Sequence, residues 1–159
     1  MNDAGRDSLR DQVGRVVGEA PILDIHTHLC PPRFGELLLY GIDDLLTYHY
    51  LVAEVFRVAP IAYERFWAMS KREQADYIFK HLFIERSPVS EACRGVLTVL
   101  QAFGLDVGKR DLTDIRSHLN AMPVDAYVNK VFELSNVKSV IMTNDPFDDV
   151  ERAVWETGK

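Results

Sequence analysis

The sequence has few of the features that mark several large protein classes. It holds two cysteines, Cys30 and Cys93, and neither belongs to a CxxC pair. We therefore expect reduced thiols in a cytoplasmic protein rather than a disulfide scaffold. No run of Lys or Arg interrupts the acidic balance of 18 basic and 24 acidic residues, so we expect no nucleic acid and no anionic membrane surface as a partner. GxGxxG and P-loop glycine patterns are missing too, which removes the common nucleotide-binding signatures.

Long apolar runs are also missing. The longest uncharged stretches fall short of the ~18 apolar residues that a membrane helix needs, and residues 1–7 are polar, without an apolar signal core. We therefore expect neither insertion in a membrane nor export. Apolar residues nevertheless make up 47% of the 159 residues, and charged residues make up 26%. That composition is sufficient for a folded core, and the length predicts one domain.

Most of the chain has helical patterns. We expect one helix across residues 42–56, because its apolar residues share one helical face, with His49 on that face. Ser70 and Glu73 have the spacing of a capping box, which predicts a helix after residue 70. Further helices are expected over residues 7–18, 88–103 (with Ser87 as its cap), 112–122 and 123–134.

Two segments are typical of strands. Residues 22–29 form a short, mostly apolar run bounded by prolines, and residues 137–143 are β-branched and apolar. Two strands that are joined through helices imply a parallel sheet, and such a sheet needs more strands than these two. The sequence thus predicts an α/β order of elements that is mostly helical. We expect a single incomplete domain over 1–159, with a first strand at 20–30, a helical insertion at 31–136, and a second strand and following helix at 137–159.

Two histidines at the end of the first strand are the strongest candidates for chemistry. One residue, Thr27, separates His26 from His28, so the two side chains point to the same face of a strand. This spacing lets two imidazole nitrogens reach one divalent ion, and the carboxyl end of a strand is where α/β barrels build active sites. Asp24 shares that face and is a candidate acceptor for a ring N–H. A pair of strand histidines without a metal is the alternative.

Two further segments carry candidate substrate-binding groups. His49 lies beside Tyr50, whose phenol can donate to a sugar hydroxyl or a carboxylate. A half-buried structural histidine is the alternative interpretation of His49. Residues 143–146 end the second strand, and Asp145 there either lines the same pocket or only caps the following helix. Other residues with reactive side chains are expected in the core, as for Cys93, or at the surface, as for His81 and His118.

These segments together resemble the N-terminal part of the uronate (glucuronate) isomerase family, a branch of the amidohydrolase superfamily of metal-dependent (β/α)8 TIM barrels. Residues 22–29 are similar to the family's first-strand motif, residues 43–50 lead to its histidine–tyrosine pair, and residues 140–146 are similar to its second-strand segment. The helical region between the strands is similar to the family's insertion after strand one. The resemblance covers essentially the whole chain, which would be about the first third of such an enzyme.

The resemblance implies a role for each candidate residue. His26 and His28 would hold a divalent ion, for which we expect zinc, while His49, Tyr50 and Asp145 would bind a small-molecule sugar acid. The implied reaction is the aldose–ketose isomerisation of a hexuronate, of the D-glucuronate to D-fructuronate type, in which a proton moves between C2 and C1. The family's general base, an aspartate on the last barrel strand, is expected outside these residues. We therefore expect little activity from this chain alone.

Two alternatives to an isomerase stay open. A metal-dependent hydrolase of the same superfamily would use the same histidine pair, so only substrate tests separate the two activities. A chain that is not an enzyme would be a helical oligomer or a remnant, and its exposed strand edges would favour self-association. We expect a homo-oligomer.

Overall fold

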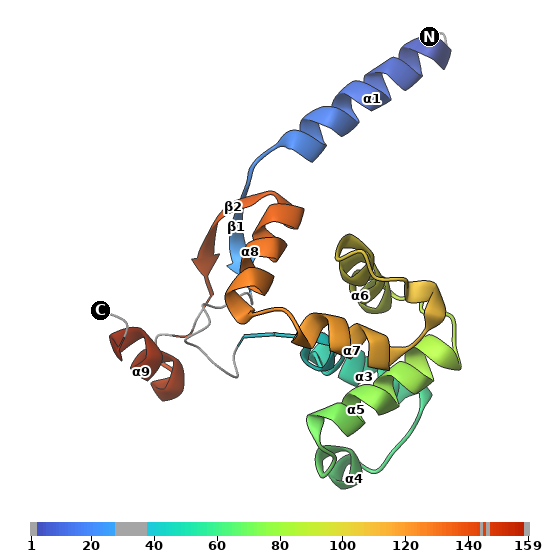
Figure 1. Ribbon diagram of the computed structural model, residues 1–159, viewed down its shortest axis with the longest axis vertical. Coiled ribbons are helices and arrows are strands. Elements are labelled where there is room, and N and C mark those ends of the chain that lie inside the picture. Colours follow the sequence, from blue (N-terminus) through green and yellow to red (C-terminus); the bar gives the residue numbers. More distant parts are fainter. Residues whose placement is uncertain (1–2, 28–37, 144, 146, 158–159) are drawn as a thin grey trace. The chain divides into compact units, whose positions relative to one another are not determined.

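Helices make up most of the computed structural model, and its two strands form a small parallel sheet (Figure 1). The structure describes residues 3–27, 38–143, 145 and 147–157. Within these ranges no helix is long and apolar enough to cross a membrane. The contacts divide the chain into two compact units, which are described separately: the strand unit, residues 1–37 and 128–159, and the helical unit, residues 38–127.

The strand unit is built around β1 (Ile22–Thr27) and β2 (Val137–Met142), which lie side by side in parallel. Their register begins with Ile22 opposite Val137 and contains two irregularities. Asn136 precedes β2 with a left-handed backbone (φ 52°), and its carbonyl oxygen accepts a hydrogen bond from the N–H of Ile22 at 3.0 Å. Its side-chain amide donates to the carbonyl oxygens of Glu19 and Ala20. These bonds hold the amino ends of the strands together, and the expectation of a mostly helical chain with a parallel pair is confirmed.

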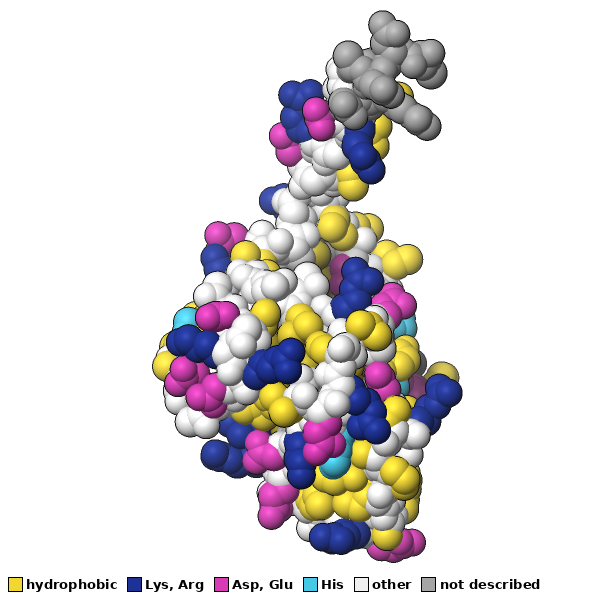
Figure 2. Space-filling view, turned by 90° about the vertical axis from the view of Figure 1, so that its right-hand side faces the viewer, with side chains coloured by type: hydrophobic (Ala, Val, Ile, Leu, Met, Phe, Trp, Pro, Cys, Tyr) yellow, Lys and Arg dark blue, Asp and Glu magenta, His cyan; other side chains and the backbone are white. Residues whose placement is uncertain are grey.

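Helices α1 (Asp3–Glu19) and α9 (Asp149–Thr157) belong to the strand unit, together with most of α8 (Val124–Ser135). The helix expected over residues 7–18 is therefore confirmed. Figure 2 shows apolar side chains along one side of α1, beside its charged side chains. Many apolar side chains of this unit are about half exposed or more: Leu9, Val13, Val16, Val17, Ile22, Leu23, Ile25 and Ile141. Within the described part of the chain, no other residues bury these apolar side chains.

The helical unit has a core of its own. Its elements are α2 (Ile42–Leu46), α3 (His49–Val58), α4 (Tyr63–Trp67), α5 (Lys71–Phe79), the π-helical turn η2 (Lys80–Ile84), α6 (Glu91–Ala102), the 3₁₀ turn η3 (Val107–Lys109), α7 (Leu112–Asn120) and the start of α8. The side chains that are almost completely buried come from nearly all of these helices: Ile42, Leu46, Val55, Phe66, Ile78, Cys93, Leu100 and Leu119. The expected core position of Cys93 is therefore confirmed.

The single helix expected across residues 42–56 is wrong, because the chain breaks between α2 and α3. The hydroxyl of Thr47 donates to the carbonyl oxygen of Asp43 at 2.7 Å, and side-chain bonds of this kind compete with helical geometry. Tyr48 then adopts an extended backbone (φ −63°, ψ 142°) and becomes the N-cap of α3. As a result, His49 is exposed in the first turn of α3 and does not lie on an apolar face.

The predicted helix signals of the next segments are confirmed in part. Ser70 and Glu73 form the expected capping box, with the Ser70 N–H donating to Glu73 Oε2 at 2.8 Å and the Glu73 N–H donating to Ser70 Oγ at 3.3 Å. The cap of α6 is Ser90 and not Ser87. The N–H of Val89 bonds to the carbonyl oxygen of Ser87, so the chain makes a tight turn before the helix begins.

Candidate functional site

The carboxyl ends of the two strands meet at one edge of the sheet. The hydroxyl of Thr143 donates to the carbonyl oxygen of Thr27 at 2.9 Å, and Thr27 is buried. Because parallel strands run in the same direction, the residues that end β1 and those that follow β2 leave the sheet at this edge. His26 and Asp145 therefore belong to the same edge, as expected from the sequence.

His26 is the described member of the predicted metal pair, and its side chain is exposed. One carboxylate oxygen of Asp24 accepts a hydrogen bond from the backbone N–H of His26 at 3.0 Å, which fixes the backbone of the strand end. His28 lies outside the described residues. Among those described, no three His, Cys, Asp or Glu side chains gather closely enough to hold a metal ion. Imidazole is a ligand type that zinc commonly takes, and the metal pair stays a prediction.

Asp145 makes the local contacts of a turn before α9. Its Oδ1 accepts a hydrogen bond from the N–H of Phe147 at 2.8 Å, and its own N–H donates to Glu151 at 2.7 Å. Asp148, and not Asp145, caps α9, because its Oδ1 accepts from the N–H groups of Val150 and Glu151, both at 2.9 Å. Asp145 is exposed, so its carboxylate remains open to a ligand as well, and its substrate-binding role stays a prediction.

His49 and Tyr50 lie in the helical unit, in the first turn of α3. The His49 ring contacts two phenol rings, with its centroid 4.2 Å from that of Tyr48 and 4.1 Å from that of Tyr50, and the two phenol rings also contact each other at 5.5 Å. Partial burial, and then the charge of Tyr50, raise the pKa of the Tyr48 phenol. At neutral pH, Tyr48 is thus a hydrogen-bond donor. Tyr50 is 62% exposed, so its hydroxyl is accessible to a small polar molecule.

Tyr50 also lines a cavity of about 860 Å³ between α3 and the start of α6. This volume is within the range of small-molecule sites. The polar lining groups include Glu54 and Arg57 of α3 and Ser90, and Ser90 Oγ donates to Glu54 Oε2 at 2.7 Å. Sequence reasoning missed this cavity. The signal was present, because Tyr50, Glu54 and Arg57 have the spacing of one helix face.

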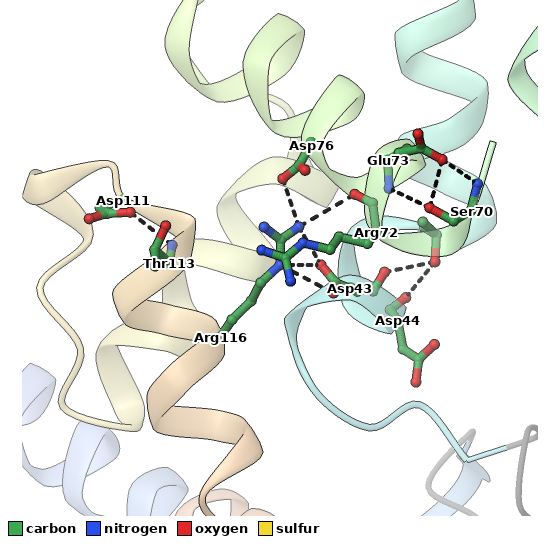
Figure 3. Close-up of polar contacts among 10 residues, drawn as sticks. Asp43, Asp44, Ser70, Arg72, Glu73, Asp76, Asp111, Thr113 and Arg116 are labelled. Atoms are coloured by element: carbon green, nitrogen blue, oxygen red, sulfur yellow. Dashed lines mark hydrogen bonds and ion pairs between the residues drawn. The ribbon is translucent and has the colours of Figure 1, made fainter.

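An ion cluster around the buried Arg116 contacts the helix that precedes the His49–Tyr50 segment, and sequence reasoning missed it too. Arg116 of α7 is 7% exposed, and its guanidinium pairs with Asp43 of α2 and Asp76 of α5 (Figure 3). These carboxylates raise the pKa of Arg116 although its burial acts in the opposite direction. No local motif predicts the cluster, because 73 residues separate Arg116 from Asp43.

One solved structure is similar to this chain over its whole length. The fold matches the crystal structure of a uronate isomerase from Bacillus halodurans C-125, with a TM-score of 0.92 and 55% sequence identity. The match covers 100% of this chain and 37% of that chain, so this chain spans about a third of the length of the isomerase. No family model and no curated protein matches the sequence. The resemblance to the uronate isomerase family, drawn from three short motifs, is therefore confirmed over all 159 residues.

Proposed function

We propose that this chain carries the ion-binding strand and part of the sugar-acid site of a hexuronate isomerase. The observation that carries the proposal is the 55% identity to a uronate isomerase across the whole chain. Under this proposal, β1 and β2 are the first two strands of a metal-dependent (β/α)8 barrel, and the helical unit is the insertion that follows the first strand. The parallel pairing of β1 and β2 supports that assignment, because all strands of such barrels are parallel.

The proposed reaction interconverts an aldose and a ketose form of a hexuronate, with D-glucuronate and D-fructuronate as the pair. His26 and His28 hold a divalent ion, zinc in this proposal, which supplies polarisation of substrate oxygens when bound. Tyr50 donates a hydrogen bond to the sugar acid, His49 orients it, and Asp145 accepts hydrogen bonds from its hydroxyl groups. The general base that moves the proton between C2 and C1 lies outside this chain. General acid–base catalysis typically contributes about 10²–10⁴-fold, so the chain alone turns over little substrate.

Zinc binding tests the ion site without depending on turnover. We expect equilibrium dialysis to find one zinc ion per chain, and we expect the double variant His26→Ala/His28→Ala to lose it. His118→Ala is the matched control, because this exposed histidine lies on α7 and has no role in the site. Unchanged zinc stoichiometry in the double variant would overturn the assignment of the ligands. Loss of zinc from the control variant would show that binding at surface histidines explains the signal.

A second candidate function is self-association, which the exposed apolar surface of the strand unit favours. Leu9 and Val16 on α1 are 55% and 68% exposed, and large contiguous apolar patches on a protein surface usually mark contacts. We propose that the chain forms a homo-oligomer through this surface. Sedimentation velocity should then show a smaller species for Leu9→Lys/Val16→Lys and no change for Val89→Lys, which alters a valine of the helical unit that is even more exposed, at 76%. An unchanged sedimentation coefficient in the double variant would contradict the proposal.

A further inference from the structure

Arg116 is a buried cation whose contacts join three helices. Its Nη2 lies 2.7 Å from Asp43 Oδ1 and 2.7 Å from Asp76 Oδ1, and its Nε donates to both Asp43 oxygens at 2.9 and 3.2 Å. The same Nη2 donates to the carbonyl oxygen of Arg72 at 3.4 Å. A buried guanidinium needs such partners, because an unpaired charge in the core is strongly unfavourable. The forked geometry fixes direction as well as distance.

The helix that Arg116 contacts is short, and it is anchored by the buried side chains of Ile42 and Leu46 as well as by its polar contacts. α2 has five residues, and its N-cap is Gly41, at φ 85° and without a side-chain cap. Helices this short are not stable in isolation. The other ion pair of α2, between Asp44 and Lys71, includes a lysine side chain that is 57% exposed. Exposed pairs of this kind contribute little. Of the two ion pairs that the structure describes for α2, the one between Arg116 and Asp43 is therefore the less exposed and the stronger restraint on the helix.

The position of α2 is transmitted directly to the His49–Tyr50 pair. Asp43, whose carboxylate Arg116 binds, also accepts the hydrogen bond of the Thr47 hydroxyl through its carbonyl oxygen, at 2.7 Å. Only Thr47 and Tyr48 separate α2 from α3, and His49 is the first residue of α3. Two residues of fixed bond geometry leave little freedom between the two helices. A displacement of α2 must therefore change where the first turn of α3 begins.

We propose that Arg116 is a positioning residue for the His49–Tyr50 pair and acts through Asp43 and α2. This inference rests on the proposed sugar-acid role of that pair, and it adds a residue that never contacts the ligand. It predicts that the pair moves when the Arg116–Asp43 contact is lost and stays in place when only stability is lost. The test therefore compares variants of these two kinds in the ligand-free chain.

The imidazole NMR signals of His49 provide the readout, with those of His81 in the same unit as the internal reference. We expect Arg116→Met to shift the His49 signals and leave the His81 signals in place. Asp43→Asn weakens the same contact from the other side, keeps Arg116 paired with Asp76, and should shift His49 in the same direction. This second variant keeps the test valid where Arg116→Met does not fold. Arg116→Lys retains the charge but not the fork, and it should restore the His49 signals in part.

Two control variants separate positioning from stability. Leu119→Ala removes a buried side chain that lies on α7 with Arg116, and Asp76→Asn removes the carboxylate that is not on α2. Both should lower the unfolding midpoint and leave the His49 signals unchanged. Equal His49 shifts in Leu119→Ala and Asp43→Asn, or no shift in Asp43→Asn, would overturn the proposal. The His49 signals are recorded without ligand. Failure of the chain to bind any sugar acid would therefore contradict the proposed function but not the positioning role of Arg116.

Discussion

Replacing Gln74 with glutamate should destabilise the helical unit in a manner that depends on pH. Gln74 of α5 is buried, and its side-chain N–H groups donate to the carbonyl oxygens of Phe66 and Met69 at 3.2 and 3.3 Å. These bonds fix the end of α4 to α5. Gln74→Glu keeps the size of the side chain but removes both donors and places a carboxylate against two carbonyl oxygens.

The magnitude follows from the two hydrogen bonds. A neutral hydrogen bond contributes about 0.5–1.5 kcal/mol net, so the isosteric apolar variant Gln74→Met should lose about 1–3 kcal/mol. Gln74→Glu should lose more at pH 7, because the ion is also taken from water. Burial would raise the pKa of the introduced carboxyl in the folded state. The free-energy cost of ionising this carboxyl in the folded state is therefore absent below the unfolded pKa of about 4.3. This cost grows as the pH rises toward the folded pKa.

Urea unfolding at pH 4 and pH 7 tests this reasoning, with each variant compared with the native sequence at the same pH. At pH 7 the unfolding midpoint should fall by on the order of 1 M in Gln74→Met, given a urea dependence of about 1–3 kcal/mol per M. It should fall further in Gln74→Glu. At pH 4 the difference between the two variants should shrink or vanish, because a protonated carboxyl can donate one hydrogen bond. An equal penalty for Gln74→Glu at both pH values would refute the argument, as would no penalty at pH 7.

Two further predictions concern groups with shifted pKa values. Hydrogen bonds from the side chain and backbone of Ser70 lower the pKa of the Glu73 carboxyl, so the capping box should contribute stability at neutral pH and lose that contribution as the pH falls through the lowered pKa. Ser70→Ala should cost about 1 kcal/mol at pH 7 and raise the Glu73 pKa in an NMR titration; an unchanged Glu73 pKa would contradict this. Burial raises the pKa of the Cys93 thiol, so in a Cys30→Ser background this thiol should react with a disulfide reagent far more slowly in the native chain than in urea. Equal rates in the two conditions would show that Cys93 is not held in the core.

Features that depend on near neighbours in the sequence could be predicted. The Ser70–Glu73 capping box and the two strands are local patterns, and the structure confirms them. The alternation of side chains along a strand likewise makes His26 and His28 a candidate pair on their spacing alone. The similarity to uronate isomerases could also be recognised from short segments, and the structural match over the whole chain confirms it.

Features that depend on a choice between competing contacts could not be predicted. The apolar pattern over residues 42–56 fits one helix, but the Thr47 hydroxyl and the extended Tyr48 divide it into two. The serine that caps α6 was misplaced by three residues, because both Ser87 and Ser90 suit a cap and a turn at Ser87 decides between them. The Arg116 cluster depends on tertiary packing, and only the fold brings its members together.

The most direct test of the proposed hexuronate site is whether the zinc-loaded chain binds D-glucuronate. Saturation-transfer NMR can detect weak binding of the sugar acid without any turnover, with D-glucose, which has no carboxylate, as the comparison ligand. We expect transfer to D-glucuronate but not to D-glucose, and loss of that transfer in His49→Ala/Tyr50→Phe and in His26→Ala/His28→Ala. Equal transfer to both sugars, or transfer that persists in both double variants, would contradict the assignment of these residues to a hexuronate site.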